Sequence, residues 1–223
     1  MPFNFSCLVA IIMEIHLFHS EQKVIQEARI AFIKILKKRY NAPTLLLLSG
    51  GSSFALLEHI PAHLFHPMLT ITVLDERFGR DVSVNNFSQL MRTQLYARAK
   101  KKGAFFIDTR IKRGDTLTKH AHRFERSLKG WKEKNKNGIL LATVGIGVDG
   151  HVAGIMPYPK NRARFHSLFE KSGRWVAGYN AGKKNPHPIR ITVTLPFLRN
   201  EIAASLTILA NSQKEAVWEK ISA

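Results

Sequence analysis

The chain has few cysteines and few acidic residues. Cys7 is the single cysteine among 223 residues, which excludes a disulfide scaffold and any zinc cluster built from cysteines and fits a reducing compartment. Only 16 Asp and Glu residues stand against 34 Lys and Arg, so the formal net charge is +18. This imbalance points to anionic partners, namely nucleic acid, a membrane surface or a phosphorylated metabolite.

Long apolar runs are also missing. Residues 3–12 are mostly apolar, but no Lys or Arg precedes them, so a secretory signal would lack its positive n-region. Glu14 and His16 end this run well short of the ~20 residues that a membrane span requires. We expect Met13 to be the native start and residues 1–12 to be an N-terminal extension. Because no Pro/Gly/Ser-rich linker and no repeat follows, residues 13–223 are expected to form one domain.

Short apolar segments alternate with segments of helical periodicity. Hydrophobic residues make up 45% of the chain, enough for a sizeable core. The segments predicted as strands are 14–19, 44–48, 69–74, 104–107, 138–144, 175–179, 189–195 and 203–210. The first predicted helix is capped by Ser20 and ends at residues 41–43. The other segments predicted as helices are 54–60, 86–98, 116–129 and 212–221. This alternation predicts an α/β fold with a largely parallel sheet flanked by helices.

The first candidate site loop, residues 49–53, follows the predicted strand 44–48. In such folds ligands bind beyond the carboxyl ends of the strands. Gly50 and Gly51 let the backbone approach a ligand, Ser52 and Ser53 add hydroxyl donors, and the next helix offers free N–H groups. The loop is either a phosphate cradle or a tight strand-to-helix turn, and by itself it favours neither. It is not a Walker loop, because no GK[ST] follows.

The second candidate is the charged triplet of residues 75–77, expected as a loop directly after the strand 69–74. Arg77 can fork onto a phosphate or carboxylate, and Asp75 can orient a hydroxyl or move a proton. Taken alone, the triplet would rather indicate a solvated strand end with an internal ion pair.

The third candidate loop, residues 145–151, follows the strand 138–144 and contains three glycines. It presents Asp149 and His151 two residues apart. Histidine titrates near neutral pH, which suits a general base, and a nearby carboxylate can hold its imidazole in one tautomer. A lone histidine is usually structural or merely exposed, but the position of His151 in a glycine-rich loop after a buried strand favours a functional role.

Two cations near the C-terminus complete the candidate set. Arg190 lies on a predicted strand, and Lys214 lies near a helix N-terminus, where a cation is favourable only beside an anion. The sequence has no G-x-S-x-G elbow, no H-E-x-x-H pair and no cluster with metal-ligand spacing. The candidate machinery is therefore acid–base chemistry with anchoring of a phosphate by Arg and Lys.

These residues occur in the order and spacing of a known family. The motifs are Ser49-Gly50-Gly51-Ser52, Asp75-Glu76-Arg77, Gly145-x-Gly147-x-Asp149-Gly150-His151-x-Ala153-x-x-x-Pro157, Arg190-Ile191-Thr192 and Lys214. From Met13 to the C-terminus the chain resembles the 6-phosphogluconolactonases. The resemblance implies the Rossmann-like fold shared with sugar-phosphate deaminases and isomerases. It also implies hydrolysis of 6-phospho-D-glucono-1,5-lactone to 6-phosphogluconate in the oxidative pentose phosphate pathway, in the cytoplasm, without a cofactor or metal.

The resemblance also assigns roles to the candidate residues. His151 would be the general base that activates water, and Asp149 would orient or tune the His151 imidazole. Asp75 would bind sugar hydroxyls or assist proton transfer. The residues that would hold the phosphate are Gly50, Gly51, Ser52, Ser53, Arg77, Arg190 and Lys214.

Two other functions stay open at this point. The related glucosamine-6-phosphate deaminases typically carry a glutamate where this chain has Met156 and a tyrosine where it has Arg77, and both differences favour the lactonase. A basic nucleic-acid-binding protein without activity would explain the charge of +18, although no nucleic-acid motif and no basic stripe interleaved with aromatics is present. The sequence does not indicate an oligomeric state.

Overall fold

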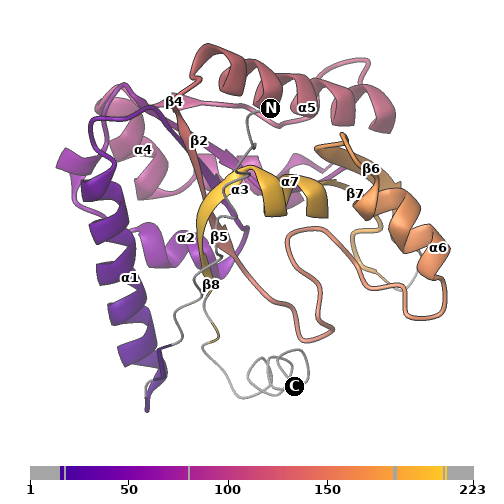
Figure 1. The fold of residues 1–223 in the computed structure, drawn as a ribbon, viewed down its shortest axis with the longest axis horizontal. Helices are drawn as coiled ribbons and strands as arrows, with labels where there is room; N and C mark the ends of the chain where they lie inside the picture. Colours follow the sequence, from indigo (N-terminus) through magenta and orange to yellow (C-terminus); the bar gives the residue numbers. More distant parts are fainter. Residues whose placement is uncertain (1–15, 18, 80, 183–184, 208, 210–223) are drawn as a thin grey trace, which may run out of the picture.

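A five-stranded parallel sheet forms the centre of the computed structural model, which describes residues 16–17, 19–79, 81–182, 185–207 and 209 (Figure 1). Its strands, in spatial order, are β4 (Phe105–Phe106), β2 (Leu69–Val73), β1 (Thr44–Leu48), β5 (Ile139–Val144) and β8 (Ile202–Thr207). Every neighbouring pair is parallel. The predicted α/β fold with a largely parallel sheet is therefore confirmed.

A second, antiparallel sheet of three strands lies beside the first. Its order is β3 (Asp75–Arg77), β7 (Ile189–Val193) and β6 (Val176–Asn180). Leu74 connects the two sheets, because its N–H donates to the Leu48 carbonyl at 2.9 Å and its carbonyl accepts from the Val193 N–H at 3.0 Å. The expectation of a loop at residues 75–77 was wrong, since the chain passes from β2 directly into a strand of the second sheet.

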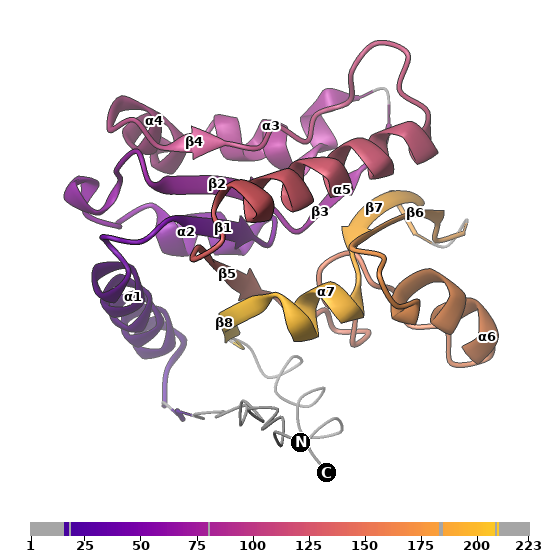
Figure 2. The ribbon, with the colours of Figure 1, turned by 45° about the horizontal axis from the view of Figure 1, so that its top comes forward.

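Helices cover both faces of the parallel sheet (Figures 1 and 2). Leu46 and Leu48 of β1 pack in one core, whereas Leu45 and Leu47 pack in another. The helices of the first core are α1 (Glu21–Lys38), α2 (Ser52–Leu57), α3 (Asn86–Met91) and α4 (Gln94–Lys101). Those of the second are α5 (Leu117–Lys134) and α7 (Leu195–Asn200). Because each face of β1 meets a core, the strand reads as an uninterrupted apolar run.

The helix boundaries follow local capping. Ser20 caps α1 as predicted, its Oγ accepting from the Lys23 N–H at 3.3 Å. The single helix predicted at 86–98 is two helices, because the Thr93 side chain accepts from the Tyr96 N–H at 3.1 Å and starts α4 anew. α5 runs five residues beyond its predicted end at residue 129.

Some elements were missed and some predictions cannot be compared. The sequence did not indicate α7, the short helix α6 (Arg162–Phe165), the π-helical turn η3 (His166–Glu170) or the 3-10 turns η1 (Ala62–Leu64) and η2 (Val82–Val84). Of the strand predicted at 14–19, the described residues His16, Leu17 and His19 are not in a strand, and the remainder lies outside the described residues. The predicted helix 212–221 and the extension 1–12 also lie outside them.

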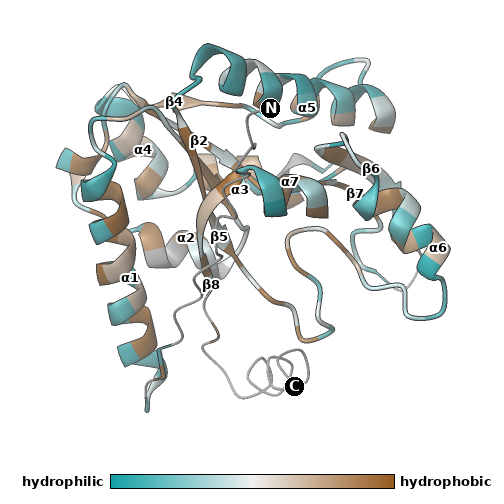
Figure 3. Cartoon of the chain, in the orientation of Figure 1, coloured by the Kyte–Doolittle hydropathy of each residue, from teal (hydrophilic) through white to brown (hydrophobic). Residues whose placement is uncertain are grey.

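Hydropathy follows this layering. Figure 3 shows apolar residues along the central strands and a polar outer surface on α5. In the described part of the chain, no helix combines the length and the apolar character needed to cross a bilayer.

Candidate active site

Three segments that carry candidate residues leave the parallel sheet at one edge. β2, β1 and β5 are neighbours in that order, so their carboxyl ends lie together. The loop of residues 49–53, here named the Gly50 loop, follows β1. β3 follows β2, and residues 145–151 follow β5. The Ser49 N–H donates to the Thr143 carbonyl at 3.2 Å and so joins the start of the Gly50 loop to the end of β5. The three candidate segments therefore lie at the edge of the sheet where α/β folds bind their ligands.

The Gly50 loop is tight for a local reason. A Cβ on Gly50 would lie 2.6 Å from Asn86 Oδ1, and Gly51 has a φ of +69°, so both positions favour glycine. The Ser53 hydroxyl donates to the Ser49 carbonyl within the same turn. Asn86, which the sequence analysis did not single out, is thus the residue against which this loop packs.

Glu76 in β3 is buried and anchors the start of α3. Its carboxyl accepts from the backbone N–H groups of Asn86 at 2.8 Å and Phe87 at 2.9 Å, and from the Thr109 hydroxyl at 2.5 Å. Burial raises the pKa of Glu76 to about 8. The alternative of a solvated strand end is wrong, because Glu76 is 0% exposed and Asp75 is 5% exposed.

Asp75 lies among positive charges. Its Oδ2 accepts from Arg190 Nη1 at 3.4 Å, and both side chains are buried. Burial raises the pKa of the Asp75 carboxyl. The positive charges of Arg190 and Arg77 oppose this rise, and the His151 imidazole lies near enough to interact with the same carboxyl. Asp75 therefore shares one electrostatic environment with the proposed phosphate ligands and the proposed base.

Two arginines lie opposite each other on adjacent strands of the antiparallel sheet. Arg77 of β3 is the register partner of Arg190 of β7. Burial, followed by the positive charge of Arg190, lowers the pKa of Arg77. Arg77 Nη1 donates to the Val84 carbonyl at 3.3 Å, but the Nε atoms of both arginines are buried with no hydrogen-bond partner among the described residues. Like charges on directly opposed positions destabilise a sheet, so this pair is suited to receive an anion.

His151 and Asp149 form a close pair in the third loop. His151 Nδ1 lies 2.5 Å from Asp149 Oδ1, which also accepts from the His151 N–H at 3.2 Å. Although partial burial opposes it, these hydrogen bonds lower the pKa of Asp149. An ionised carboxylate only accepts hydrogen bonds, so the proton between the two groups belongs to Nδ1, and Nε2 is the ring nitrogen left for another partner. Because the His151 side chain is 31% exposed, water can reach the imidazole.

Glycines permit this geometry. A Cβ on Gly147 would collide with the His151 ring, and the Gly147 N–H donates to the His151 carbonyl at 2.8 Å. Gly150 has a φ of +83°. The glycine spacing that singled out this loop thus reflects the close approach of the imidazole to the backbone.

The segment after His151 is fixed to the antiparallel sheet. The Gly154 N–H donates to Thr192 Oγ1 at 3.0 Å, and the Tyr179 hydroxyl donates to the Gly154 carbonyl at 2.6 Å. A Cβ on Gly154 would lie 3.0 Å from Asp75 Cβ. The loop that carries His151 is therefore held against the strands that carry Asp75 and Arg190. Sequence reasoning missed Tyr179 and Gly154, whereas the alternation of Arg190 and Thr192 on one strand face was a signal for Thr192.

Two predicted site residues are not placed. Lys214 lies outside the described residues, and so does the side chain of Ser52. Within the described ranges, no group of three or more His, Cys, Asp or Glu side chains could hold a metal ion.

Comparison with known proteins gives a consistent result. Residues 19–223 match the family model described as glucosamine-6-phosphate isomerases/6-phosphogluconolactonase. A segment of 77 residues is 32% identical to 6-phosphogluconolactonase 3, chloroplastic, of Arabidopsis thaliana; it is 34% of this chain and only 21% of that protein.

Solved structures of several organisms share the fold. The 6-phosphogluconolactonase of Trypanosoma cruzi superposes with a TM-score of 0.70 at 19% identity, covering 92% of this chain and 83% of that one. The Plasmodium vivax enzyme gives 0.67 at 17% identity, with 91% and 78% covered. The Thermotoga maritima enzyme gives 0.63 at 20% identity, with 91% and 85% covered.

Proposed function

The chain belongs to the glucosamine-6-phosphate isomerase/6-phosphogluconolactonase family, and we propose that it hydrolyses 6-phospho-D-glucono-1,5-lactone to 6-phosphogluconate. The observation that carries this proposal is the pairing of Asp149 with His151 in a loop that packs on the strands of Asp75, Arg77 and Arg190. One loop offers a base and the neighbouring sheet offers cations, as the hydrolysis of a phosphorylated lactone requires. Residues 13–223 are proposed to form the single domain that performs it.

In the proposed reaction His151 is the general base. Its Nε2 takes a proton from water while the water oxygen attacks the lactone carbonyl carbon. The resulting imidazolium returns a proton to the ring oxygen as the ester bond breaks. Asp149 holds Nδ1–H and stabilises the imidazolium, the role of the carboxylate in a Ser-His-Asp triad.

The phosphate binds on the arginine pair. Arg77 and Arg190 each have a buried Nε with no hydrogen-bond partner in the described part of the chain, and an anion between them would remove their mutual repulsion. Lys214 and the backbone of residues 50–53 are proposed as further phosphate ligands. Asp75, with Arg190 beside it, accepts hydrogen bonds from sugar hydroxyls. Binding energy from the distant phosphate then holds the lactone carbonyl in place for attack.

Hydrolysis fits this site better than deamination. Position 156 carries a methionine that is 7% exposed and packs in a small apolar cluster with Phe169 and Tyr179, so it cannot supply the carboxylate typical of the deaminases. Arg77 likewise adds a cation where those relatives have a tyrosine.

The first experiment follows lactone decay with the purified chain and corrects for spontaneous hydrolysis. We expect His151→Asn to lower kcat by about 10²-fold or more, because the base is lost. His166→Asn is the matched control, since His166 Nδ1 also pairs with a carboxylate, Glu170 Oε2 at 3.1 Å, in an exposed position. Full activity of the His151 variant removes that residue from the mechanism, and ammonia release from glucosamine 6-phosphate by the unaltered chain would instead identify a deaminase.

A further inference from the structure

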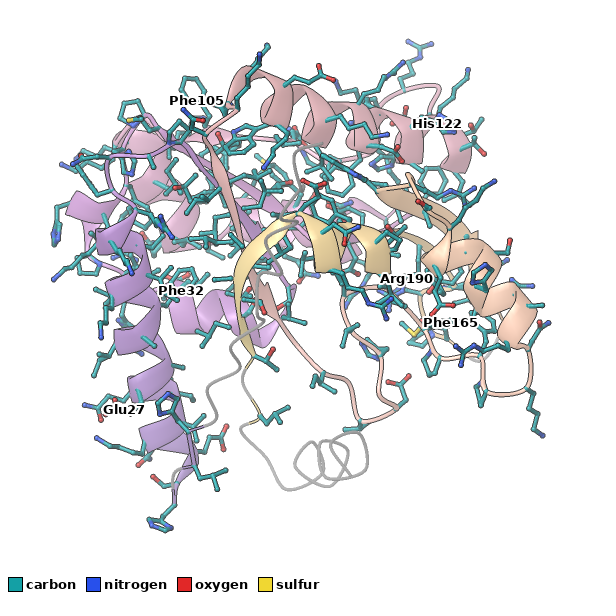
Figure 4. The ribbon with its side chains drawn as sticks, in the orientation of Figure 1. Glu27, Phe32, Phe105, His122, Phe165 and Arg190 are labelled. Atoms are coloured by element: carbon teal, nitrogen blue, oxygen red, sulfur yellow. The ribbon has the colours of Figure 1, made fainter. Side chains whose placement is uncertain are left out.

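α5 presents one row of basic side chains to solvent. The helix packs on the second core through its buried residues His120, Ala121, Phe124 and Leu128. Its opposite face exposes Lys119, His122 and Arg126, and Figure 4 shows His122 on the outer side of the helix. Positions i, i+3 and i+7 share one helix face, so the row extends over about 10 Å along the axis.

Two acidic groups beside this row, Asp115 and Glu125, already have partners. Asp115 Oδ2 pairs with Arg123 at 2.6 Å, and Glu125 Oε1 pairs with Lys129 at 2.5 Å. Lys119 and Arg126 have no ion-pair partner among the residues that the structure describes. Lys112 and Arg113, in the loop before α5, are exposed and equally unpaired within those residues. Within the described residues, the charges of Lys119 and Arg126 are therefore not compensated by an ion pair.

A hollow of about 490 Å³ lies along the row. Its lining residues are Asp115, Thr118, Lys119, His122, Arg123 and Arg126. The lining holds no Phe, Trp or Tyr ring on which an unpaired base could stack, so it suits a sugar-phosphate backbone rather than a splayed single strand.

This surface is separate from the candidate active site. In Figures 1 and 2, α5 lies on the far side of β6, β7 and α7 from the loop that follows β5 and carries His151. The basic row lies on the solvent-exposed face of α5, opposite to the buried residues of the helix. The formal charge of +18, which hydrolysis of one small lactone does not require, adds long-range attraction for a polyanion.

We propose that the α5 basic surface, formed by Lys119, His122 and Arg126, binds the phosphodiester backbone of double-stranded nucleic acid without regard to base sequence. The contacts are charge-assisted hydrogen bonds from Lys and Arg to phosphate oxygens, which displace condensed counterions. The binding function is additional to the proposed hydrolysis and does not depend on it.

The test measures fluorescence anisotropy of a labelled DNA duplex over a series of NaCl concentrations. The double variant Lys119→Ala/Arg126→Ala is expected to bind about tenfold or more weakly at low salt, with a plot of log K against log[salt] that is less steep by about 2. Lys34→Ala/Lys38→Ala removes the same charge from exposed positions of α1 and is expected to bind like the unaltered chain. Lys119→Arg/Arg126→Lys keeps the charge and is expected to keep the affinity.

Several outcomes would overturn the proposal. These are failure of the unaltered chain to bind the duplex at about 0.05 M salt, an equal loss in the α1 variant, and displacement of the duplex by poly-glutamate as readily as by unlabelled duplex. Full displacement by millimolar inorganic phosphate would also contradict it, because it would identify a small-anion site. Thermal unfolding of each variant checks its fold independently of binding and of hydrolysis.

Discussion

At the scale of single residues, the proposed contact between Arg77 and the phosphate can be tested by substitution. We expect Arg77→Ala to raise KM for the phosphorylated lactone by about 10- to 100-fold, the effect of losing a charge-assisted contact of ~1.5–3 kcal/mol. The KM for unphosphorylated gluconolactone should change little, because Arg77 is opposed to Arg190 and not to the base. Parallel steady-state kinetics on the two lactones provide the measurement.

Two further variants make this comparison specific. Arg92→Ala removes an exposed arginine at the end of α3 and should leave both KM values unchanged. Arg77→Lys retains the charge without the planar fork and should give an intermediate KM. An equal rise of KM for both lactones in Arg77→Ala would argue against a phosphate contact.

Residues whose contacts are local were predictable, and residues whose contacts cross the fold were not. Asp149 and His151 are two positions apart, so their spacing and the flanking glycines already predicted the pair that the structure shows at 2.5 Å. The opposition of Arg77 to Arg190 depends on strands far apart in the sequence. The burial of Glu76 was also unpredictable, since its three partners come from α3 and from Thr109.

At the scale of elements, Tyr179 of β6 anchors the segment that follows His151. Its hydroxyl donates to the Gly154 carbonyl, three residues after His151. We expect Tyr179→Phe to lower the free energy of unfolding by about 1 kcal/mol and kcat several-fold, with little change in KM, because the loop loses an anchor while the arginines stay in place. Tyr158→Phe is the control, since its hydroxyl makes only a 3.5 Å contact with the Asn180 carbonyl. A fall in stability without a fall in kcat would show that Tyr179 does not position His151.

Glu76 links β3 to α3 and makes their association depend on pH. Its pKa in the folded chain is about 8, above the ordinary value of 4.5, so between these pH values the unfolded chain loses a proton that the folded chain keeps. The unfolded state then binds fewer protons, and this contribution to stability is present below pH 4.5 and is lost as pH rises through 8. Glu76→Gln should make the free energy of unfolding less dependent on pH, by up to ~1.4 kcal/mol for each pH unit.

Urea unfolding at pH 5, 6.5 and 8 measures this effect. Glu133→Gln, at an exposed position of α5, is the matched control and should follow the unaltered chain. If the Glu76 variant keeps the same loss of stability with rising pH, another group is responsible for it.

The elements buried on both faces were the most predictable. β1, β2 and β5 are apolar runs that the parallel sheet requires, and each lies within a residue or two of its expected bounds. β3 was missed because a charged triplet has no strand pattern; its burial depends on Arg190 and on the N–H groups that begin α3. The break between α3 and α4 depends on a single Thr93 cap within an otherwise helical periodicity.

At the scale of the whole molecule, the charge of +18 opposes folding. Lys and Arg outnumber Asp and Glu by 34 to 16, so most cations lie without an acid to pair with, and compaction brings them together. Salt screens this repulsion, since the Debye length falls from about 30 Å at 0.01 M to about 8 Å at 0.15 M. We therefore expect NaCl over this range to raise the free energy of unfolding by about 1 kcal/mol, or the thermal midpoint by about 2–4 °C.

A charge-reversal variant separates screening from other effects of salt. Lys34→Glu with Lys136→Glu changes two exposed positions in α1 and in the turn after α5, and lowers the formal charge by four. Its thermal midpoint at 0.01 M salt should be higher than that of the unaltered chain, and its rise with NaCl smaller, because less repulsion is left to screen. A midpoint that falls with salt, or an equal rise in both chains, would show that the ion pairs of the surface outweigh the net charge in setting stability.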